Sequence, residues 1–299
     1  MSVISIEGPC RLRGELRVQG AKNSTLPLLA AAVVCKGKTV LHSCPQLSDV
    51  DAAVKILETM GCSCQREGDS LIVDSTVITA CEVPHDLMRE MRSSIVFLGA
   101  IIARVGEAKL SFPGGCELGA RPIDLHLSSL RRMGVQIDES HGCLHCTAPQ
   151  GIVGDYIHLS FPSVGATENI ILAAVLAKGT TVVENAAREP EIMDLAAYLN
   201  KCGAKIYGAG DSSIVIEGVE ELTGTEHTVM PDRIVAATYM AAAAVTGGEL
   251  LLKNTPDLSL KSMLAVFEET GCRLICDSGN LYLCAPERLK ALGRVRTMP

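Results

Sequence analysis

The chain contains one structural unit four times, and this repeat limits its possible folds more than any other feature. In each copy, a helix rich in small apolar residues ends at a glycine and precedes a short apolar strand. A loop, an amphipathic helix that also ends at a glycine, and short closing strands complete the copy. Glycine suits both helix ends because the residue there commonly adopts left-handed backbone angles. This βαβαββ order predicts a compact α/β fold rather than a helical solenoid.

The predicted elements follow the same order in every copy. Copy one has 22–35, Gly37, 39–42, 49–60, Gly61 and 70–74. Copy two has 92–104, Gly106, 109–112, 122–133, Gly134 and 143–147. Copy three has 165–177, Gly179, 181–184, 191–202, Gly203 and 213–217. Copy four has 232–245, Gly247, 249–253, 258–270, Gly271 and 280–284.

One loop breaks the regularity of the repeat. The two glycines are 24 residues apart in copies one, three and four, but 28 apart in copy two. The additional residues lie in the glycine-rich segment between Phe112 and Pro122, which contains Cys116 and Arg121. An insertion at one place in a repeated scaffold is typical of a functional site, although a repeat protein also tolerates a neutral insertion.

Cys116 therefore has two interpretations. It is either an inert small side chain in a turn or a reactive thiol on a glycine-rich loop. Pro122 suits the first turn of the following helix, where free N–H groups attract anions. A thiol and the Arg121 guanidinium near such a helix start favour a chemical role with an anionic ligand.

The repeats also predict the domain organisation. Residues 21–229 hold three complete units and would close one domain, whereas 1–20 plus 230–299 would supply about one unit of a second. A single unit would leave an apolar helix face uncovered. We therefore expect a C-terminally truncated chain that has weak activity at best.

Composition excludes several classes of protein. The net charge of −7 makes a nucleic-acid partner improbable, and no apolar run is long enough for a membrane span. The N-terminus carries too many charges for a signal peptide. Thirteen scattered cysteines suit reduced thiols and hence a cytoplasmic location. Cys143 and Cys146, near His141 and His145, resemble half a zinc site, but a plain strand is the favoured interpretation.

Polar residues stand at the starts of the four small-residue helices. They are Lys22 and Asn23, Arg92, the segment Ser163-Val164-Gly165, and Asp232 with Arg233. Helix starts bind anions through free N–H groups, so these ends could form a shared pocket. Ordinary helix capping by serine and aspartate is the alternative.

Several motifs together identify the chain as similar to a known family. They are Lys22-Asn23, Met91-Arg92-Ser93-Ser94, Pro113-Gly114-Gly115-Cys116, Gly119 to His126, Ser163 to Thr167, Glu184 to Glu191 and Pro231-Asp232-Arg233. They resemble the UDP-N-acetylglucosamine 1-carboxyvinyltransferases, and the resemblance extends over essentially all 299 residues. The Pro-Gly-Gly-Cys loop separates this family from the shikimate-pathway enolpyruvyl transferase.

The resemblance implies an enolpyruvyl-transferase-like inside-out α/β barrel fold, with four of six βαβαββ units present. It implies transfer of enolpyruvate from phosphoenolpyruvate to the 3′-hydroxyl of UDP-N-acetylglucosamine, the first committed step of peptidoglycan precursor synthesis. The partners would be these two small molecules, without nucleic acid, membrane, metal or organic cofactor. The family is about a third longer, and its base aspartate and closing arginine would lie beyond residue 299.

The resemblance also implies roles for individual residues. Lys22 and Asn23 would contact phosphoenolpyruvate, and Arg92 would lie at the substrate cleft. The UDP part would be held by Arg121, Pro122, Ile123, Asp124 and Leu125 together with Ser163, Val164 and Gly165. Many family members have a lysine where this chain has Phe161, which puts that phosphate contact in question.

Cys116 would act as the catalytic acid. An ordinary thiol, with a pKa near ~8.5, is protonated at neutral pH and can deliver a proton to the enol carbon. Arg121 would stabilise charge on the phosphate and would favour some thiolate, which could add to the substrate. The alternatives are a non-catalytic UDP-sugar-binding fragment, the shikimate-pathway enzyme, and a purely structural repeat protein.

Overall fold

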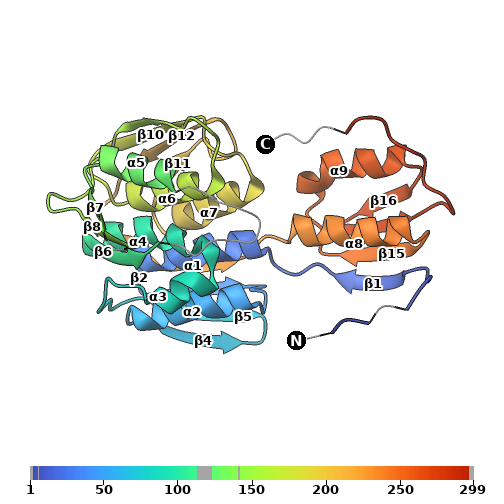
Figure 1. The fold of residues 1–299 in the computed structure, drawn as a ribbon, viewed down its shortest axis with the longest axis horizontal. Helices are drawn as coiled ribbons and strands as arrows, with labels where there is room; N and C mark the ends of the chain where they lie inside the picture. Colours follow the sequence, from blue (N-terminus) through green and yellow to red (C-terminus); the bar gives the residue numbers. More distant parts are fainter. Residues whose placement is uncertain (1–2, 6, 113–122, 141, 296–299) are drawn as a thin grey trace. The chain divides into compact units, whose positions relative to one another are not determined.

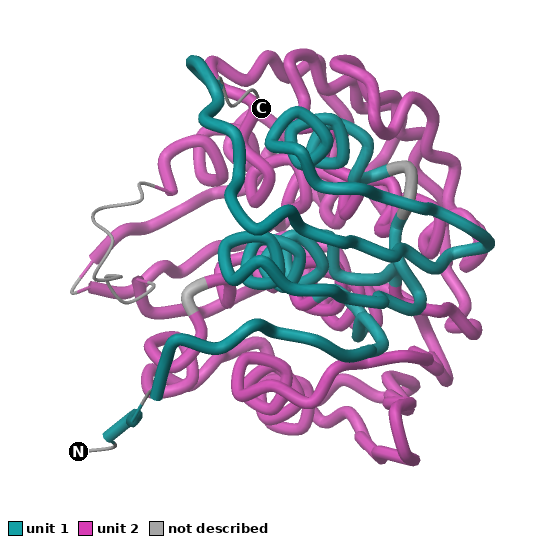
Figure 2. The backbone as a smooth tube through the Cα atoms, turned by 90° about the vertical axis from the view of Figure 1, so that its right-hand side faces the viewer, with its two compact units in different colours: residues 1–21, 230–298 teal, residues 22–229, 299 magenta. Residues whose placement is uncertain are grey.

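The computed structural model describes residues 3–5, 7–112, 123–140 and 142–295, and the chain forms two compact units. Unit 1 combines both ends of the chain, residues 1–21 and 230–298, and unit 2 comprises Lys22–Val229 with Pro299 (Figure 2). The prediction that unit 2 is a complete three-repeat domain stays a prediction.

Unit 2 alternates helices and strands along the chain. Its first part contains α1 (Lys22–Val34), β2 (Cys35–Lys36), β3 (Lys38–His42), α2 (Ser48–Thr59), β4 (Ser63–Glu67), β5 (Ser70–Asp74) and α3 (His85–Glu90). Its second part contains the 3₁₀ helix η1 (Arg92–Val96), α4 (Phe97–Val105), β6 (Glu107–Ser111), α5 (Asp124–Arg132), β7 (Gln136–Ser140) and β8 (Cys143–Thr147). Its last part contains β9 (Tyr156–His158), α6 (Val164–Ala174), β10 (Thr180–Glu184), α7 (Pro190–Lys201), β11 (Lys205–Tyr207), β12 (Ser213–Glu217), β13 (Leu222–Thr223) and β14 (Glu226–Thr228).

Helices occupy the interior of unit 2 and sheets form its outside (Figure 1). The three larger sheets have the orders β14-β3-β5-β4, β6-β8-β7 and β11-β12-β10-β9, one for each predicted copy, and β13 pairs parallel with β2 in a further two-stranded sheet. In each of the three larger sheets the two closing strands of the copy pair antiparallel. The predicted α/β class and the inside-out arrangement of repeated units are therefore present in unit 2.

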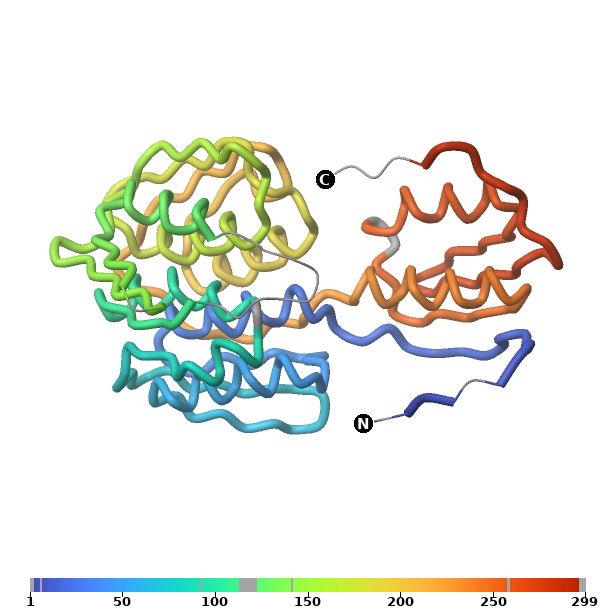
Figure 3. The backbone as a smooth tube through the Cα atoms, viewed as in Figure 1, coloured from blue at the N-terminus to red at the C-terminus, as the bar shows by residue number. Residues whose placement is uncertain are grey.

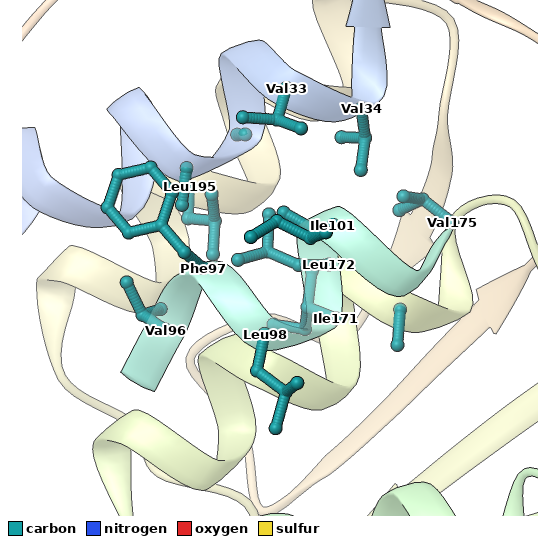
Figure 4. Close-up of a cluster of buried hydrophobic side chains, with 14 of the residues drawn as sticks. Val33, Val34, Val96, Phe97, Leu98, Ile101, Ile171, Leu172, Val175 and Leu195 are labelled. Atoms are coloured by element: carbon teal, nitrogen blue, oxygen red, sulfur yellow. The ribbon is translucent and has the colours of Figure 1, made fainter. Parts of the chain in front are cut away.

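The first helices of the three copies form the core of unit 2. All residues of α1 from Ser24 to Val34 are buried, and α1, α4 and α6 pack against one another. Figure 4 shows Val33 of α1, Ile101 of α4 and Leu172 of α6 in one apolar cluster. A helix that is apolar around its whole circumference is stable only when other elements surround it. The sequence predicts such burial for the first helix of every copy; this is confirmed for α1, α4 and α6 but is wrong for the first helix of copy four, residues 233–245, of which only Ala236, Met240, Ala243 and Ala244 are buried.

Gly99 allows α4 and α6 to approach closely. A Cβ atom at Gly99 would lie 2.3 Å from the backbone oxygen of Asn169. The Gly99 backbone N–H donates to Asn169 Oδ1 at 2.7 Å, and Asn169 Nδ2 donates to the Ile95 carbonyl at 2.8 Å. From α6, the buried Asn169 amide is therefore hydrogen-bonded both to Gly99 of α4 and to Ile95 of η1.

Unit 1 is a single repeat with one additional strand. Its elements are β1 (Arg13–Arg17), α8 (Arg233–Val245), β15 (Glu249–Lys253), α9 (Asp257–Glu269), β16 (Arg273–Asp277) and β17 (Asn280–Cys284). The sheet order is β1-β15-β17-β16, and in Figure 3 the blue β1 segment runs beside the orange β15 segment. Its core includes Met240, Leu252 and Leu283, whereas Ile234 and Val245 of α8 are exposed. Its first helix thus has an exposed apolar face, unlike α1.

Two strands pair with repeats far from them in sequence. β1 precedes the first copy but pairs parallel with β15 of the fourth, with Leu16 opposite Leu252. β14 precedes the fourth copy but pairs parallel with β3 of the first, with His227 opposite Leu41. The sequence predicted extended segments near residue 20, but alternation of residue types does not identify a strand's partner.

The predicted helix at 92–104 differs in detail from the observed one. Met91 is extended, with φ −125° and ψ 111°, and the chain then forms η1 before α4. The short helix α3 before it was not predicted from the sequence. The sequence pattern did not separate η1 from α4 because apolar residues continue through both.

The Gly99 contact makes a testable prediction about stability. Replacing Gly99 with alanine should lower the free energy of unfolding by about 1–3 kcal/mol, because the new Cβ has no space against α6. Urea denaturation measures the change. The control is Val105→Ala at the exposed end of α4, expected within about 0.5 kcal/mol of wild type. Equal stability of the G99A variant would contradict the close packing.

Candidate functional site

The start of α1 presents Lys22 and Asn23, as predicted. The Lys22 ammonium forms an ion pair with Asp49 Oδ2 at 2.9 Å, and Asp49 lies in the first turn of α2. The two side chains are 43% and 30% exposed, so the pair is accessible from solvent. The ion-paired lysine is the first residue of α1, where the positive end of the helix dipole also favours anionic ligands.

The starts of α5 and α6 form a second part of the candidate site. Asp124 and Leu125 open α5, and Ile123 precedes it. Ser163 precedes α6, and its hydroxyl accepts a hydrogen bond from the Ala166 backbone N–H at 3.4 Å. α5 and α6 pack against each other, so the structure brings two of the predicted segments together.

His126 links these two helix starts, although sequence reasoning gave it no role. A Cβ atom at Gly165 would lie 3.3 Å from His126 Nε2, which places the ring beside the first turn of α6. The Asn169 amide lies 2.7 Å from His126 Nδ1 and donates to it, since the Asn169 oxygen already accepts from Gly99. The proton of the neutral ring is therefore on Nε2, at the Gly165 side.

Burial lowers the pKa of His126 to about 4. The ring is therefore uncharged at neutral pH and provides an N–H donor rather than a positive charge. The sequence could have pointed to this residue, because His126 is the last residue of the family motif that begins at Gly119.

Arg92 is the first residue of η1, which packs against α1 and α6. Arg92 therefore belongs to an element that contacts both α1, which begins at Lys22, and α6, which follows Ser163. Cys116, Arg121 and Pro122 lie outside the described residues. Their grouping with the other predicted site residues stays a prediction.

The capping interpretation holds at two of the helix starts. Besides Ser163, Asp232 caps α8, where its Oδ1 accepts from the backbone N–H groups of Ile234 and Val235 at 2.9 and 3.0 Å. Capping leaves the other N–H groups of the turn open, so it does not conflict with ligand binding. Phe161 is 61% exposed near the start of α6, where the resemblance led us to expect a lysine.

The two cysteines that resemble half a zinc site in the sequence do not face each other in the structure. Cys143 and Cys146 lie three positions apart on β8, so their side chains point to opposite faces of the sheet. Cys143 is exposed, Cys146 is buried, and His145 contacts Glu107 with 2.9 Å between Nε2 and Oε1. In the described part of the chain no three His, Cys, Asp or Glu side chains are grouped to hold a metal ion.

A cluster of carboxyl groups lies where α6 meets α7. Glu168 on α6 and Glu191 on α7 are buried, and burial together with the charges of Glu191 and Glu189 raises the pKa of Glu168 to about 8. Glu168 therefore carries a proton at neutral pH, because burial disfavours its charged form and the two neighbouring glutamates repel a further negative charge. The sequence showed these glutamates but not their proximity.

None of the helices in the described ranges is both long and apolar enough to cross a membrane. The chain matches a family model described as EPSP synthase (3-phosphoshikimate 1-carboxyvinyltransferase) over residues 6–296. It is 49% identical over 299 residues to UDP-N-acetylglucosamine 1-carboxyvinyltransferase 2 of Caldanaerobacter subterraneus subsp. tengcongensis, covering 100% of this chain and 72% of that protein. The chain belongs to the UDP-N-acetylglucosamine 1-carboxyvinyltransferase family.

A further family member is similar in sequence, and two solved structures are similar in fold. UDP-N-acetylglucosamine 1-carboxyvinyltransferase 1 of Symbiobacterium thermophilum is 46% identical, with 98% of this chain and 68% of that protein covered. The enolpyruvyl transferase NikO from Streptomyces tendae has a TM-score of 0.84 at 24% identity, over 94% of this chain and 67% of that one. EPSP synthase from Acinetobacter baumannii has a TM-score of 0.72 at 20% identity, over 95% and 67%. The predicted enolpyruvyl-transferase fold is therefore confirmed, and the chain is a transferase of the 1-carboxyvinyl type.

The Glu168 pKa makes stability depend on pH. Its pKa is about 8 in the folded chain and ordinarily 4.5, so between these values the folded state holds a proton that the unfolded state has lost. Stability should therefore decrease as pH rises through this window, by at most about 1.4 kcal/mol per pH unit. The variant Glu168→Gln should reduce this slope and exceed wild type in stability at pH 8.

Urea denaturation at pH 5, 6.5 and 8 measures this effect. The matched control is Glu220→Gln, which replaces an exposed glutamate and should keep the wild-type slope. Parallel pH profiles for wild type and E168Q would refute a protonated Glu168.

Proposed function

We propose that this transferase moves the enolpyruvyl group of phosphoenolpyruvate to the 3′-hydroxyl of UDP-N-acetylglucosamine and releases phosphate, a step of peptidoglycan precursor synthesis. The supporting observation is the 49% identity to a relative of that name across the entire chain. The family model is described by the shikimate-pathway reaction, but the relatives at 42–49% identity carry the nucleotide-sugar name.

Lys22 and Asn23 would bind the phosphate or carboxylate of phosphoenolpyruvate at the start of α1. Two features support this role: the ammonium and the positive end of the helix dipole. Asp49 would hold the ammonium in place through its ion pair, in which Lys22 Nζ and Asp49 Oδ2 are 2.9 Å apart. Arg92 would add a second cation from η1.

The starts of α5 and α6 would hold the UDP part of the acceptor. The backbone around Ser163 to Gly165 and the residues Ile123 to Leu125 lie on packed helices of unit 2. The neutral His126 ring beside Gly165 would provide an N–H donor without adding charge. Arg121 and Pro122 would extend this part of the site.

Cys116 would supply a proton to the methylene carbon of phosphoenolpyruvate while the sugar hydroxyl adds to the neighbouring carbon. Loss of phosphate and of one proton from the resulting tetrahedral intermediate then yields the enol ether. Arg121 would stabilise the negative charge of the intermediate. The sugar hydroxyl gives up its proton as its oxygen adds, and the proton lost from the methyl group on elimination replaces the one that the thiol supplied. No atom changes oxidation state overall, so the reaction calls for no external oxidant or reductant.

A non-catalytic nucleotide-sugar-binding role is the second candidate function. It is favoured by the coverage of the relatives, because the chain spans 72% and 68% of the length of two of them. The two candidates share the surface of α5 and α6 but differ in turnover, so one experiment separates them.

The experiment measures phosphate release from phosphoenolpyruvate and calorimetric binding of UDP-N-acetylglucosamine. Replacing Cys116 with serine should reduce turnover by about 10²-fold or more, because the proton donor is lost, and leave nucleotide-sugar binding unchanged. The control Cys143→Ser, at an exposed cysteine of β8, should keep the wild-type rate. If the wild-type chain bound UDP-N-acetylglucosamine saturably but released no phosphate, the binding role would be supported. If it neither bound the nucleotide sugar nor released phosphate, both candidate functions would be excluded.

A further inference from the structure

A chain of four polar side chains connects α1, α7 and β14 inside unit 2. The Ser24 hydroxyl of α1 donates a short hydrogen bond to Asp194 Oδ2 of α7. The other oxygen of Asp194, Oδ1, lies 2.9 Å from His227 Nε2 of β14. His227 Nδ1 in turn lies 3.3 Å from the Lys201 ammonium at the last turn of α7.

The contacts of His227 determine where its proton lies. The Lys201 ammonium has only N–H donors, so His227 Nδ1 must accept from it. Nε2 then carries the proton of the neutral ring and donates to Asp194. Asp194 therefore accepts from both Ser24 and His227, which orients its carboxylate with one oxygen toward each.

Packing restricts the movement of this network. Ser24 is completely buried, and the side chains of His227 and Asp194 are 5% and 11% exposed. Tyr198 lies edge-on to the His227 ring, with ring centroids 5.5 Å apart, and its hydroxyl bonds to Thr39 Oγ1 at 2.7 Å. Hydrogen bonds that are buried and oriented in this way hold a side chain in one position.

The network affects the candidate site through the position of Ser24. Ser24 follows Lys22 and Asn23 directly in the first turn of α1, so a bond that fixes Ser24 also fixes the backbone beside them. The Asp194 carboxylate also carries negative charge near the positive end of the α1 dipole.

We propose that Asp194 is a positioning residue for phosphoenolpyruvate: through Ser24 it holds the first turn of α1, and thereby Lys22 and Asn23, in the ligand-binding arrangement. This inference rests on the proposed function for the identity of the ligand. It does not require Asp194 to touch the substrate. A displacement of about 1 Å at such a turn is enough to weaken binding and slow the reaction.

The test compares substitutions within the network. Asp194→Ala and Ser24→Ala should each raise the KM for phosphoenolpyruvate about tenfold, while the KM for UDP-N-acetylglucosamine changes less than about twofold. The double variant should match the larger single effect, since both substitutions remove the same bond. Asp194→Asn should recover most of the loss, because its amide oxygen can accept from His227 and its NH₂ can donate to Ser24.

The control is Glu221→Gln, which removes the carboxylate of an exposed ion pair with Lys36 elsewhere in unit 2. It should leave both KM values unchanged. If the D194A variant lost thermal stability but kept the wild-type KM for phosphoenolpyruvate, Asp194 would be only structural and the inference would be wrong.

A measurement without turnover separates this inference from the proposed function. The backbone amide NMR signals of Lys22 and Asn23 should shift in the D194A variant, return toward wild type in D194N, and stay unchanged in E221Q. If the signals shifted in this pattern but the chain showed no turnover, the positioning role of Asp194 would be supported and the proposed reaction would be wrong. Unchanged signals in D194A would overturn the positioning role whatever the activity.

Discussion

The close packing of the small-residue helices α1, α4 and α6 is the contact on which unit 2 depends. The backbones of α4 and α6 come especially close at Gly99, where a side chain would collide with the α6 backbone. The sheets then cover the outside of this helical core (Figure 1). Each of these three helices lies at the start of its repeat. The packing that buries the middle of the helices therefore also fixes the positions of their first turns in unit 2.

Polar groups connect this core to the candidate site. Asn169 accepts from Gly99 of α4 and donates to His126 of α5, so the same buried amide joins the helix contact to the ring beside Gly165. Ser24 and Asp194 make the corresponding connection between α1 and α7. In both cases a side chain from the core orients a helix start. The candidate site is therefore supported by interior hydrogen bonds rather than by surface loops alone.

Carboxyl groups in the same interior have different neighbours. Glu168 is held neutral by burial and by the nearby charges of Glu191 and Glu189. Asp194 instead accepts hydrogen bonds from the Ser24 hydroxyl and the His227 ring. The first carboxyl group therefore faces other acids, whereas the second faces hydrogen-bond donors that hold it in one orientation.

The sequence predicted much of the fold because its information was local and repeated. Glycines after helices and apolar stretches located the main helices within a few residues. The expected burial of the first helix of each copy holds for α1, α4 and α6 but not for α8, which has fewer elements packed around it. It also identified Lys22, Asn23 and the Ser163 segment as helix starts. The role of Cys116 follows from the sequence motif, and the described residues do not test it.

The amino-acid sequence by itself thus determined the repeating unit, its α/β class and the family resemblance, since periodicity, glycine positions and motifs are all readable along the chain. Only the tertiary structure decided that β1 joins β15, that β14 joins β3, and that His126 lies against Gly165. It alone brought Ser24 to Asp194, 170 positions away. Such pairings depend on how separate elements pack in space, and no local pattern of residue types records them.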